Sequence, residues 1–181
     1  SQVSDGASAM LLVSEEGLKR LGRSMADTIE LIGTGHSTAS LYEDSDPTVL
    51  STSAHAIQQA YAAAGVHAGQ VNIAEVHDCF TVTELLMYEA MGIAAPGKGG
   101  DLLAEGVTDI GGRVPVNTGG GLVGFGHPVG ATGVKQAVEI WRQMKGKAGG
   151  YQVPGSPGIG LTVNMGGDDR TTVVGVFKNV G

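Results

Sequence analysis

The sequence contains a single cysteine, few aromatic residues and only 11 lysines and arginines among its 181 residues. One cysteine excludes an internal disulfide framework and any zinc site built from several thiolates. The net charge of −7, without any basic run, argues against a nucleic-acid surface, which needs clustered cations to contact phosphates. No apolar run approaches the roughly 18 residues that span a bilayer, and the N-terminus lacks the regions of a signal peptide. We therefore expect no nucleic-acid partner and no membrane partner.

Glycine is abundant instead, with 31 residues grouped mainly around 97–133 and 146–167. They follow no fixed period, which excludes a collagen-like chain. Grouped glycines are typical of tight loops where backbone or ligand approaches closely. The chain length and the 41% hydrophobic content predict one medium-sized domain, or one domain with a remnant of another. The five histidines show no spacing typical of metal ligands, so we expect no metal site.

Apolar runs alternate with amphipathic segments, which predicts an α/β fold with a mixed five-stranded sheet covered by helices on both faces. Ser51 and Thr52 are expected to cap the first long helix, and Thr81 with Glu84 resembles a capping box for the second. The expected elements are strands at 6–14, 28–36 and 71–76, helices at 51–65 and 81–92, and a closing hairpin of strands at 158–163 and 171–177.

The only cysteine lies in the stretch "EVHDCF" at 75–80, directly after a predicted strand. Ligands bind at the carboxyl ends of strands in open α/β sheets, so His77, Asp78 and Cys79 occupy a favourable position. A thiol beside an imidazole and a helix N-terminus suits proton transfer or nucleophilic attack. The alternative is an inert buried thiol, because free cysteine is among the most buried residue types. For Asp78, a structural capping role is expected.

Two further motifs carry candidate site residues. In "GFGHPVGATG" (124–133), His127 precedes a predicted helix with Pro128 suited to its first turn, and the alternative is a histidine that only caps this helix. In "NMGGDD" (164–169), the backbone amide of Gly166 is a candidate oxyanion donor in a nest of amides. The alternative for this motif is an ordinary hairpin turn.

A nucleotide-binding motif almost appears, because Gly119, Gly121 and Gly124 match the pattern G-x-G-x-x-G. A pyrophosphate would have to bind the N-terminus of the following helix. We expect that helix to begin only near His127, which is too late for this role, so a dinucleotide site is rejected.

Together, "HDCF" (77–80), "GHPVGATG" (126–133) and "NMGG" (164–167) resemble the C-terminal half of a thiolase of the sterol-carrier-protein-2 type. The resemblance covers nearly the whole chain. It implies that residues 1–27 are the end of the thiolase N-terminal domain and that 28–181 are the C-terminal domain. The implied activity is that of an acyltransferase of lipid metabolism, in fatty acid β-oxidation or sterol metabolism, which cleaves or forms 3-ketoacyl-CoA by thiolytic Claisen chemistry. Its substrates would be acyl-CoA and CoA, without a separate cofactor.

The resemblance also implies roles for four residues. His127 would activate the nucleophile, Cys79 would move the α-proton of the acyl-CoA, His77 would polarise the thioester carbonyl, and the Gly166 amide would complete an oxyanion hole. The nucleophilic cysteine of the family lies in the N-terminal half, and this sequence contains no second cysteine. We therefore expect an N-terminal thiolase half as partner, a homodimer when complete, and no activity from this chain alone.

Two other functions remain open beside thiolysis. One is a thiolase-like aldolase that cleaves steroid side-chain CoA esters with a small partner protein. Such relatives commonly lose the thiolase cysteines, so the retention of "HDCF" favours a thiolase. The other is a non-catalytic module that binds CoA esters or lipids. The final "FKNVG" is no peroxisomal signal, so the compartment stays open between peroxisome, mitochondrion and cytoplasm.

Small residues after His127 predict close packing against another helix. Gly130, Ala131 and Gly133 lie near the start of the expected helix. The resemblance implies that the neighbour is the matching helix of the N-terminal half. We expect this strip to be exposed or covered by another chain.

Overall fold

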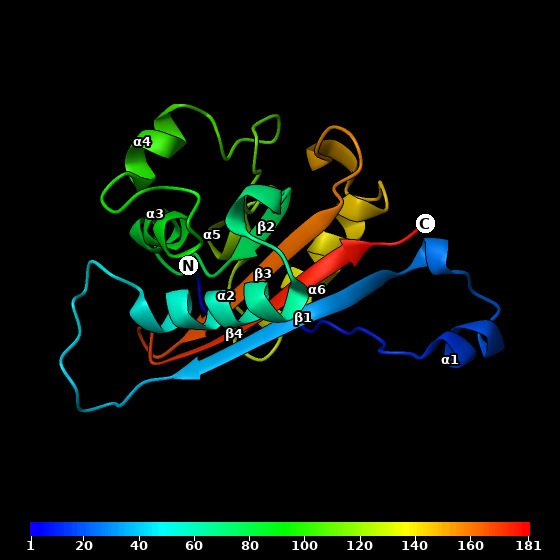
Figure 1. Cartoon of the computed structure of the whole chain (residues 1–181), viewed down its shortest axis with the longest axis horizontal. Helices are drawn as coiled ribbons and strands as arrows, with labels where there is room; N and C mark the ends of the chain where they lie inside the picture. Colours follow the sequence, from blue (N-terminus) through cyan, green and yellow to red (C-terminus); the bar gives the residue numbers. More distant parts are fainter.

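A four-stranded mixed sheet with the order β1-β4-β3-β2 forms the centre of the computed structural model, which describes all residues 1–181 (Figure 1). β4 pairs antiparallel with both β1 and β3, whereas β2 is parallel to β3. The α/β class is confirmed, but the expected fifth strand is wrong: residues 6–14 form no strand, and Leu11 and Leu12 are exposed. The strands are β1 (Ile29–Thr38), β2 (Ile73–Val76), β3 (Ile159–Gly166) and β4 (Thr171–Asn179).

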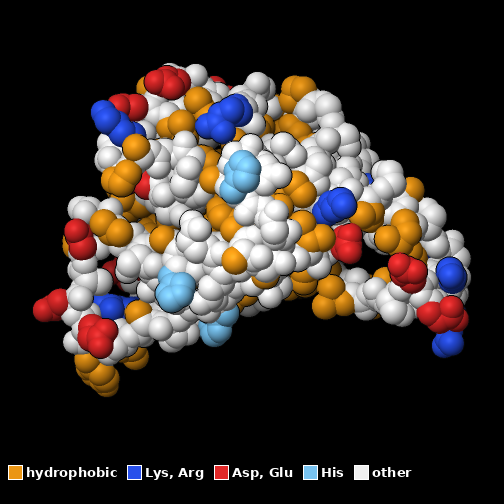
Figure 2. Space-filling view, viewed as in Figure 1, with side chains coloured by type: hydrophobic (Ala, Val, Ile, Leu, Met, Phe, Trp, Pro, Cys, Tyr) orange, Lys and Arg blue, Asp and Glu red, His pale blue; other side chains and the backbone are white.

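Helices cover both faces of this sheet, with α2 and α3 on one side and α6 on the other (Figure 1). The short helix α1 lies on an arm that stands out from the body, with acidic and basic side chains at its tip (Figure 2). No helix is both long enough and apolar enough to cross a bilayer. The helices are α1 (Glu15–Arg20), α2 (Ser51–Ala64), α3 (Thr81–Ala90), α4 (Gly99–Ala104), α5 (Gly121–Phe125) and α6 (Thr132–Met144), with 3-10 turns η1 (Met25–Asp27), η2 (Ala68–Gln70) and η3 (Gly149–Tyr151).

A distant carboxylate caps the N-terminus of α2. The N-cap position is Leu50, so the expected capping by the side chains of Ser51 and Thr52 is wrong. The Asp169 carboxylate accepts hydrogen bonds from the backbone N–H of Thr52 at 2.8 Å and of Ser53 at 2.9 Å. It also accepts from the Ser53 hydroxyl at 2.6 Å. The hairpin turn after β3 thereby satisfies the unpaired donors of the first helical turn.

The expected capping box at the start of α3 is also wrong. The N-cap residue is Phe80, whose side chain cannot accept a hydrogen bond, and Thr81 is the first helical residue. The Glu84 carboxylate accepts from the Tyr88 hydroxyl and, at 2.7 Å, from the side-chain amide of Asn117. Glu84 therefore joins α3 to the loop before α5 instead of capping its own helix.

Left-handed glycines follow both of these helices, as the sequence predicts. Gly65 has a φ of 66° and caps α2, and Gly92, one residue after the α3 C-cap, has a φ of 75°. Only glycine adopts this backbone conformation without a steric penalty.

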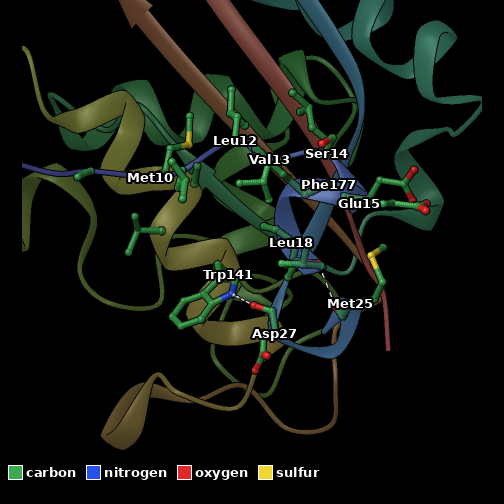
Figure 3. Close-up of a pocket in the computed structure, with 18 residues that line it drawn as sticks. Met10, Leu12, Val13, Ser14, Glu15, Leu18, Met25, Asp27, Trp141 and Phe177 are labelled. Atoms are coloured by element: carbon green, nitrogen blue, oxygen red, sulfur yellow. Dashed lines mark hydrogen bonds between the residues drawn. The ribbon is translucent and has the colours of Figure 1, made fainter. Parts of the chain in front are cut away.

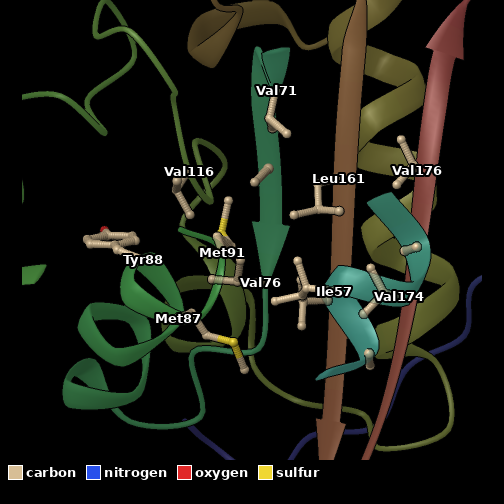
Figure 4. Packing of buried hydrophobic residues seen from close by; sticks show 14 of the residues in the cluster. Ile57, Val71, Val76, Met87, Tyr88, Met91, Val116, Leu161, Val174 and Val176 are labelled. Atoms are coloured by element: carbon tan, nitrogen blue, oxygen red, sulfur yellow. The ribbon is translucent and has the colours of Figure 1, made fainter. Parts of the chain in front are cut away.

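The main core lies between the sheet and the helices α2 and α3 (Figure 4). Ile57 from α2 and Met87 from α3 meet Val76, Leu161 and Val174 from three strands, and all five side chains are fully buried. α2 also approaches β1 very closely at Gly35. A Cβ placed on this glycine would lie only 1.9 Å from a backbone carbonyl oxygen of α2.

A smaller core lies between the sheet and α6, where Ile73, Ile140 and Phe177 pack together. An ion pair with one buried member lies on the same side of the sheet. The Lys135 ammonium lies 3.6 Å from the carboxylate of Glu75, which is only 1% exposed. Burial raises the pKa of Glu75 to about 8, and nearby Lys135 partly offsets this rise.

The region before α6 differs from the sequence prediction. A short helix, α5, begins at Gly121, and α6 begins at Thr132, five residues after His127. Pro128 accordingly lies in the turn before α6 and not in its first helical turn. His127 lies in the loop between the two helices.

Candidate active site

His77 lies directly beyond β2, at the carboxyl end of this strand. Because β2 runs parallel to β3 with Val76 opposite Val163, His77 comes beside Asn164. Its Nδ1 lies 2.9 Å from the Asn164 side-chain oxygen, and the residue is only 5% exposed. Burial lowers the pKa of His77 below its usual value, while the hydrogen bond to Asn164 acts in the opposite direction.

His127 approaches His77 from the loop between α5 and α6. The two imidazole rings meet edge to face, with 4.9 Å between their centroids and an angle of 87° between their planes. His127 Nδ1 lies 2.7 Å from the hydroxyl of the buried residue Thr132. The fold therefore brings together two of the residues selected from the sequence, through a strand end and a loop that are distant in the chain.

Cys79 is half-buried, and its Sγ lies 3.8 Å from the hydroxyl of Thr83 in the first turn of α3. The backbone nitrogen of Ser1 lies 2.6 Å from the Cys79 carbonyl oxygen. The next residue, Gln2, accepts from the backbone N–H of His127 at 2.9 Å. Two successive residues thus bridge the Cys79 segment and the His127 loop, which places these segments on either side of the same stretch of chain.

Asp78 caps α5, which confirms its expected structural role. Its carboxylate accepts from the backbone N–H of Leu122 at 2.6 Å and of Val123 at 3.3 Å. The prediction that no helix begins near the G-x-G-x-x-G pattern is wrong, because α5 begins at Gly121. A protein carboxylate already occupies the first amides of that helix, which disfavours a phosphate at this place.

Gly166 lies two residues beyond Asn164, at the end of β3. Its carbonyl accepts from the Arg170 amide at 3.1 Å and closes the hairpin turn. The structure contains no hydrogen bond from Gly166 to His77 or His127, so its role as an oxyanion donor stays a prediction. The adjacent Asp168 and Asp169 both have positive φ, at 55° and 61°, consistent with a tight turn.

Two residues that contact the histidines were not selected from the sequence as site residues. They are Asn164, which binds His77, and Thr132, which binds His127. Both lie inside motifs that the sequence does mark, "NMGG" and "GHPVGATG". Their roles depend on contacts that the motifs alone do not reveal.

The small-residue strip after His127 is only partly free. An added Cβ on Gly130 would meet nothing within 4 Å, but one on Gly133 would lie 2.4 Å from the Asn164 side-chain nitrogen. Ala131 is buried. The expectation that the whole strip packs only against another chain is therefore wrong, since Gly133 makes room for a residue of the site itself.

An apolar face lies further along α6. Ala137, Val138 and Trp141 line a cavity of about 620 Å³ together with the segment before β1 (Figure 3). The Trp141 indole N–H donates to the Asp27 carbonyl at 2.9 Å, which ties α6 to the chain leading into β1. Apolar side chains from 9–31 make up most of the remaining lining.

Comparisons with known proteins agree with this arrangement. Residues 33–179 match the family model described as thiolase C-terminal domain-like. The chain is 37% identical to an acetyl-CoA acetyltransferase of Methanothermobacter thermautotrophicus, covering 98% of this chain and 46% of that protein. It is 38% identical to sterol carrier protein 2 of Oryctolagus cuniculus, covering 90% of this chain and 30% of that protein. It is also 36% identical to the benzoylsuccinyl-CoA thiolase subunit BbsB of Thauera aromatica, covering 93% and 43%. The chain thus spans less than half the length of these relatives.

Solved structures show the same fold. An Ltp2-ChsH2(DUF35) aldolase superimposes with a TM-score of 0.71 at 25% identity, over 83% of this chain and 39% of that one. A monomeric SCP2-thiolase-like protein of Mycobacterium smegmatis superimposes with a TM-score of 0.67 at 20% identity, over 92% and 32%. At 20% identity, the second comparison shows only that the two chains share a fold.

Proposed function

The chain belongs to the thiolase family through its C-terminal domain, and from this premise we propose that it is the catalytic C-terminal half of an acyl-CoA thiolase. It would cleave or form 3-ketoacyl-CoA together with a nucleophilic cysteine from an N-terminal half. The observation that carries the proposal is the edge contact of His77 and His127, with Cys79 on the segment that follows His77. Acyl-CoA and CoA are the proposed substrates, and a homodimer is the proposed assembly.

In the proposed reaction, the nucleophilic thiol gives its proton to His127 and attacks the 3-keto carbon of the substrate. The bond between the α-carbon and this carbon then breaks, and the electron pair stays on the α-carbon as an enolate of acetyl-CoA. The Cys79 thiol donates its proton to that carbon and later takes the thiol proton of CoA. The CoA thiolate then displaces the acyl group, while His127 returns its proton to the departing nucleophilic cysteine. A base and an acid within hydrogen-bond reach of the reacting atoms are what this chemistry needs.

The contact with Asn164 supports an indirect role for His77 in stabilising the enolate oxygen. When Nδ1–H of His77 donates to Asn164, the neutral ring has a lone pair and no hydrogen at Nε2. A water molecule that donates one hydrogen to this nitrogen and the other to the thioester oxygen would connect the two. Once His127 has accepted the proton of the nucleophile, its N–H would donate directly to the same thioester oxygen.

The test is thiolysis of acetoacetyl-CoA by the full parent chain, or by this chain combined with the N-terminal half. We expect turnover from the complete enzyme and none from this chain alone. Cys79→Ala should reduce kcat/KM by about 10²- to 10⁴-fold, the usual contribution of a general acid or base. Glu16→Gln on the exposed helix α1 serves as the control and should leave the activity unchanged. Turnover by this chain alone, or full activity of the Cys79→Ala enzyme, would contradict the proposal.

Aldol cleavage of a CoA ester is the second candidate, because the solved aldolase shares the fold over most of this chain. Such a reaction does not use the thiol of Cys79 for thiolysis, and the products differ because no CoA is consumed. Measuring CoA consumption with the wild-type enzyme and the Cys79→Ala variant therefore separates the two activities.

A further inference from the structure

We propose that Thr132 is a positioning residue for His127: its hydroxyl holds Nδ1 of the ring in the protonated state and leaves Nε2 as the basic nitrogen. This inference refines the proposed function, in which His127 is a general base and therefore needs an available lone pair. Its catalytic meaning rests on that function. The tautomer itself is a property of this chain and is measurable without turnover.

The contact is short and shielded from water. Thr132 is 3% exposed, and its Oγ1 lies 2.7 Å from Nδ1 of His127 and 3.1 Å from the carbonyl oxygen of Pro128. A hydroxyl has one hydrogen to donate but two lone pairs that accept. If this hydrogen points to the Pro128 carbonyl, the hydroxyl oxygen can only accept from His127, and Nδ1 must then carry a hydrogen.

The opposite arrangement has the hydroxyl donating to Nδ1, with the hydrogen of the ring on Nε2. In that arrangement Nε2 already carries a hydrogen and has no lone pair with which to accept a proton. Protonation of the ring at Nδ1 would leave the hydroxyl without its acceptor. The arrangement with Nδ1–H serves the neutral and the protonated ring without any rotation of the hydroxyl. It therefore suits a histidine that accepts a proton and later returns it.

The Nε2 atoms of both histidines are open to the site. No protein group forms a hydrogen bond with Nε2 of His77 or of His127. Only one fully buried side-chain nitrogen or oxygen in the chain lacks a hydrogen-bond partner, and it is the side-chain oxygen of Gln136. The two Nε2 atoms are therefore not fully buried and reach solvent. Each ring is thus held at Nδ1, by Asn164 and by Thr132, and presents Nε2 outward.

The experiment is nitrogen-15 NMR of the 181-residue chain with labelled histidine, which reads the protonation of each ring nitrogen directly. In the neutral ring of His127 we expect a protonated Nδ1 and an unprotonated Nε2. Thr132→Val keeps the side-chain shape but removes the acceptor, and should shift the tautomer ratio by roughly 2- to 12-fold towards Nε2–H, the equivalent of one net hydrogen bond. Thr132→Ser retains the hydroxyl and should restore the wild-type ratio.

Asn164→Ala is the matched control, because it removes the corresponding partner of His77. It should alter the signals of His77 and leave the tautomer of His127 unchanged. Predominance of Nε2–H in wild-type His127, or an unchanged ratio in a folded Thr132→Val chain, overturns the inference. If Thr132→Val fails to fold, the wild-type tautomer and the Thr132→Ser variant still decide the question. If the complete enzyme shows no thiolase activity although His127 has the expected tautomer, the proposed function is contradicted and the inference about Thr132 is not.

Discussion

The side chains of His77 and Asn164 meet across two parallel strands, with 2.9 Å between Nδ1 and Oδ1. His77 directly follows the last residue of β2, beside a position where β3 carries a polar side chain between two buried apolar ones. This contact holds the buried His77 ring, which also meets the ring of His127 edge to face. The site is therefore assembled from a strand end, a strand interior and a loop.

Substitution of Asn164 should change the pKa of His77 in a predictable direction. Asn164→Ala removes the oxygen that accepts from the ring, so the charged ring loses stabilisation and the pKa should fall further below its usual value. Asn164→Asp places a negative charge beside the ring and should raise this pKa. Proton NMR titration of His77 in both variants measures the effect, and shifts of the same sign in the two would contradict it.

The turn after β3 should contribute to stability through Asp169. Asp169→Ala leaves two amides and a hydroxyl at the start of α2 without their acceptor and should cost about 1–3 kcal/mol. Asp168→Ala is the matched control, because Asp168 is exposed and has a similar positive φ, so the backbone strain of alanine is the same in both variants. Urea unfolding compares them, and equal losses would show that the cap contributes nothing.

The buried carboxyl group of Glu75 should make stability depend on pH. Its pKa of about 8 in the folded chain lies above the ordinary value of 4.5, so the folded state binds more protons than the unfolded state between these values. Stability from this group is complete below about pH 4.5 and is lost as the pH rises through 8. Glu75→Gln should remove this loss, making the chain about 1–4 kcal/mol more stable than wild type above pH 8.

Urea unfolding between pH 5 and pH 9 measures this difference. Glu16→Gln, on the exposed helix α1, is the control and should follow the wild-type profile. A parallel pH profile for Glu75→Gln and wild type would rule out a raised pKa at Glu75.

Gly133 should tolerate substitution less well than its neighbour Gly130. The Cβ of alanine at 133 would lie 2.4 Å from the Asn164 side chain, whereas at 130 it would meet nothing within 4 Å. Gly133→Ala should cost about 1–3 kcal/mol, as overpacking does, and weaken the contact between Asn164 and His77. Gly130→Ala should stay within about 0.5 kcal/mol of wild type. Thermal melts of this chain measure both, and equal stability would contradict the contact at Gly133.

Interactions between residues close together in the chain make several features predictable from the sequence. The helix ends at Gly65 and Gly92 follow from a left-handed backbone that glycine alone adopts without strain. The closing hairpin follows from two β-rich runs around a short turn. His77 and His127 were selected because a chemically active residue type lay at the end of a predicted strand or among glycines. All of these signals involve residues close together in the chain.

The groups that cap the helices could not be predicted in this way, although the expected helices at 51–65 and 81–92 begin at the same residues as α2 and α3. The cap of α2 comes from Asp169, which is distant in sequence, and α3 begins after Phe80 without a side-chain cap. α5 was missed, because its amides are capped by Asp78 from another element. Local capping rules cannot identify acceptors that only the folded chain brings near.

The α/β class, the four strands, the three longest helices and the motifs of the site follow from the sequence, because periodicity and turn chemistry act over a few residues. The number of strands depends on long-range pairing, since an apolar run such as 6–14 forms a strand only when a neighbouring strand supplies its hydrogen bonds. The contacts of His77 with Asn164 and of His127 with Thr132 likewise depend on the folded chain. Hydrogen bonds between side chains need distances of about 3 Å, which parallel pairing and loop closure establish and sequence order does not.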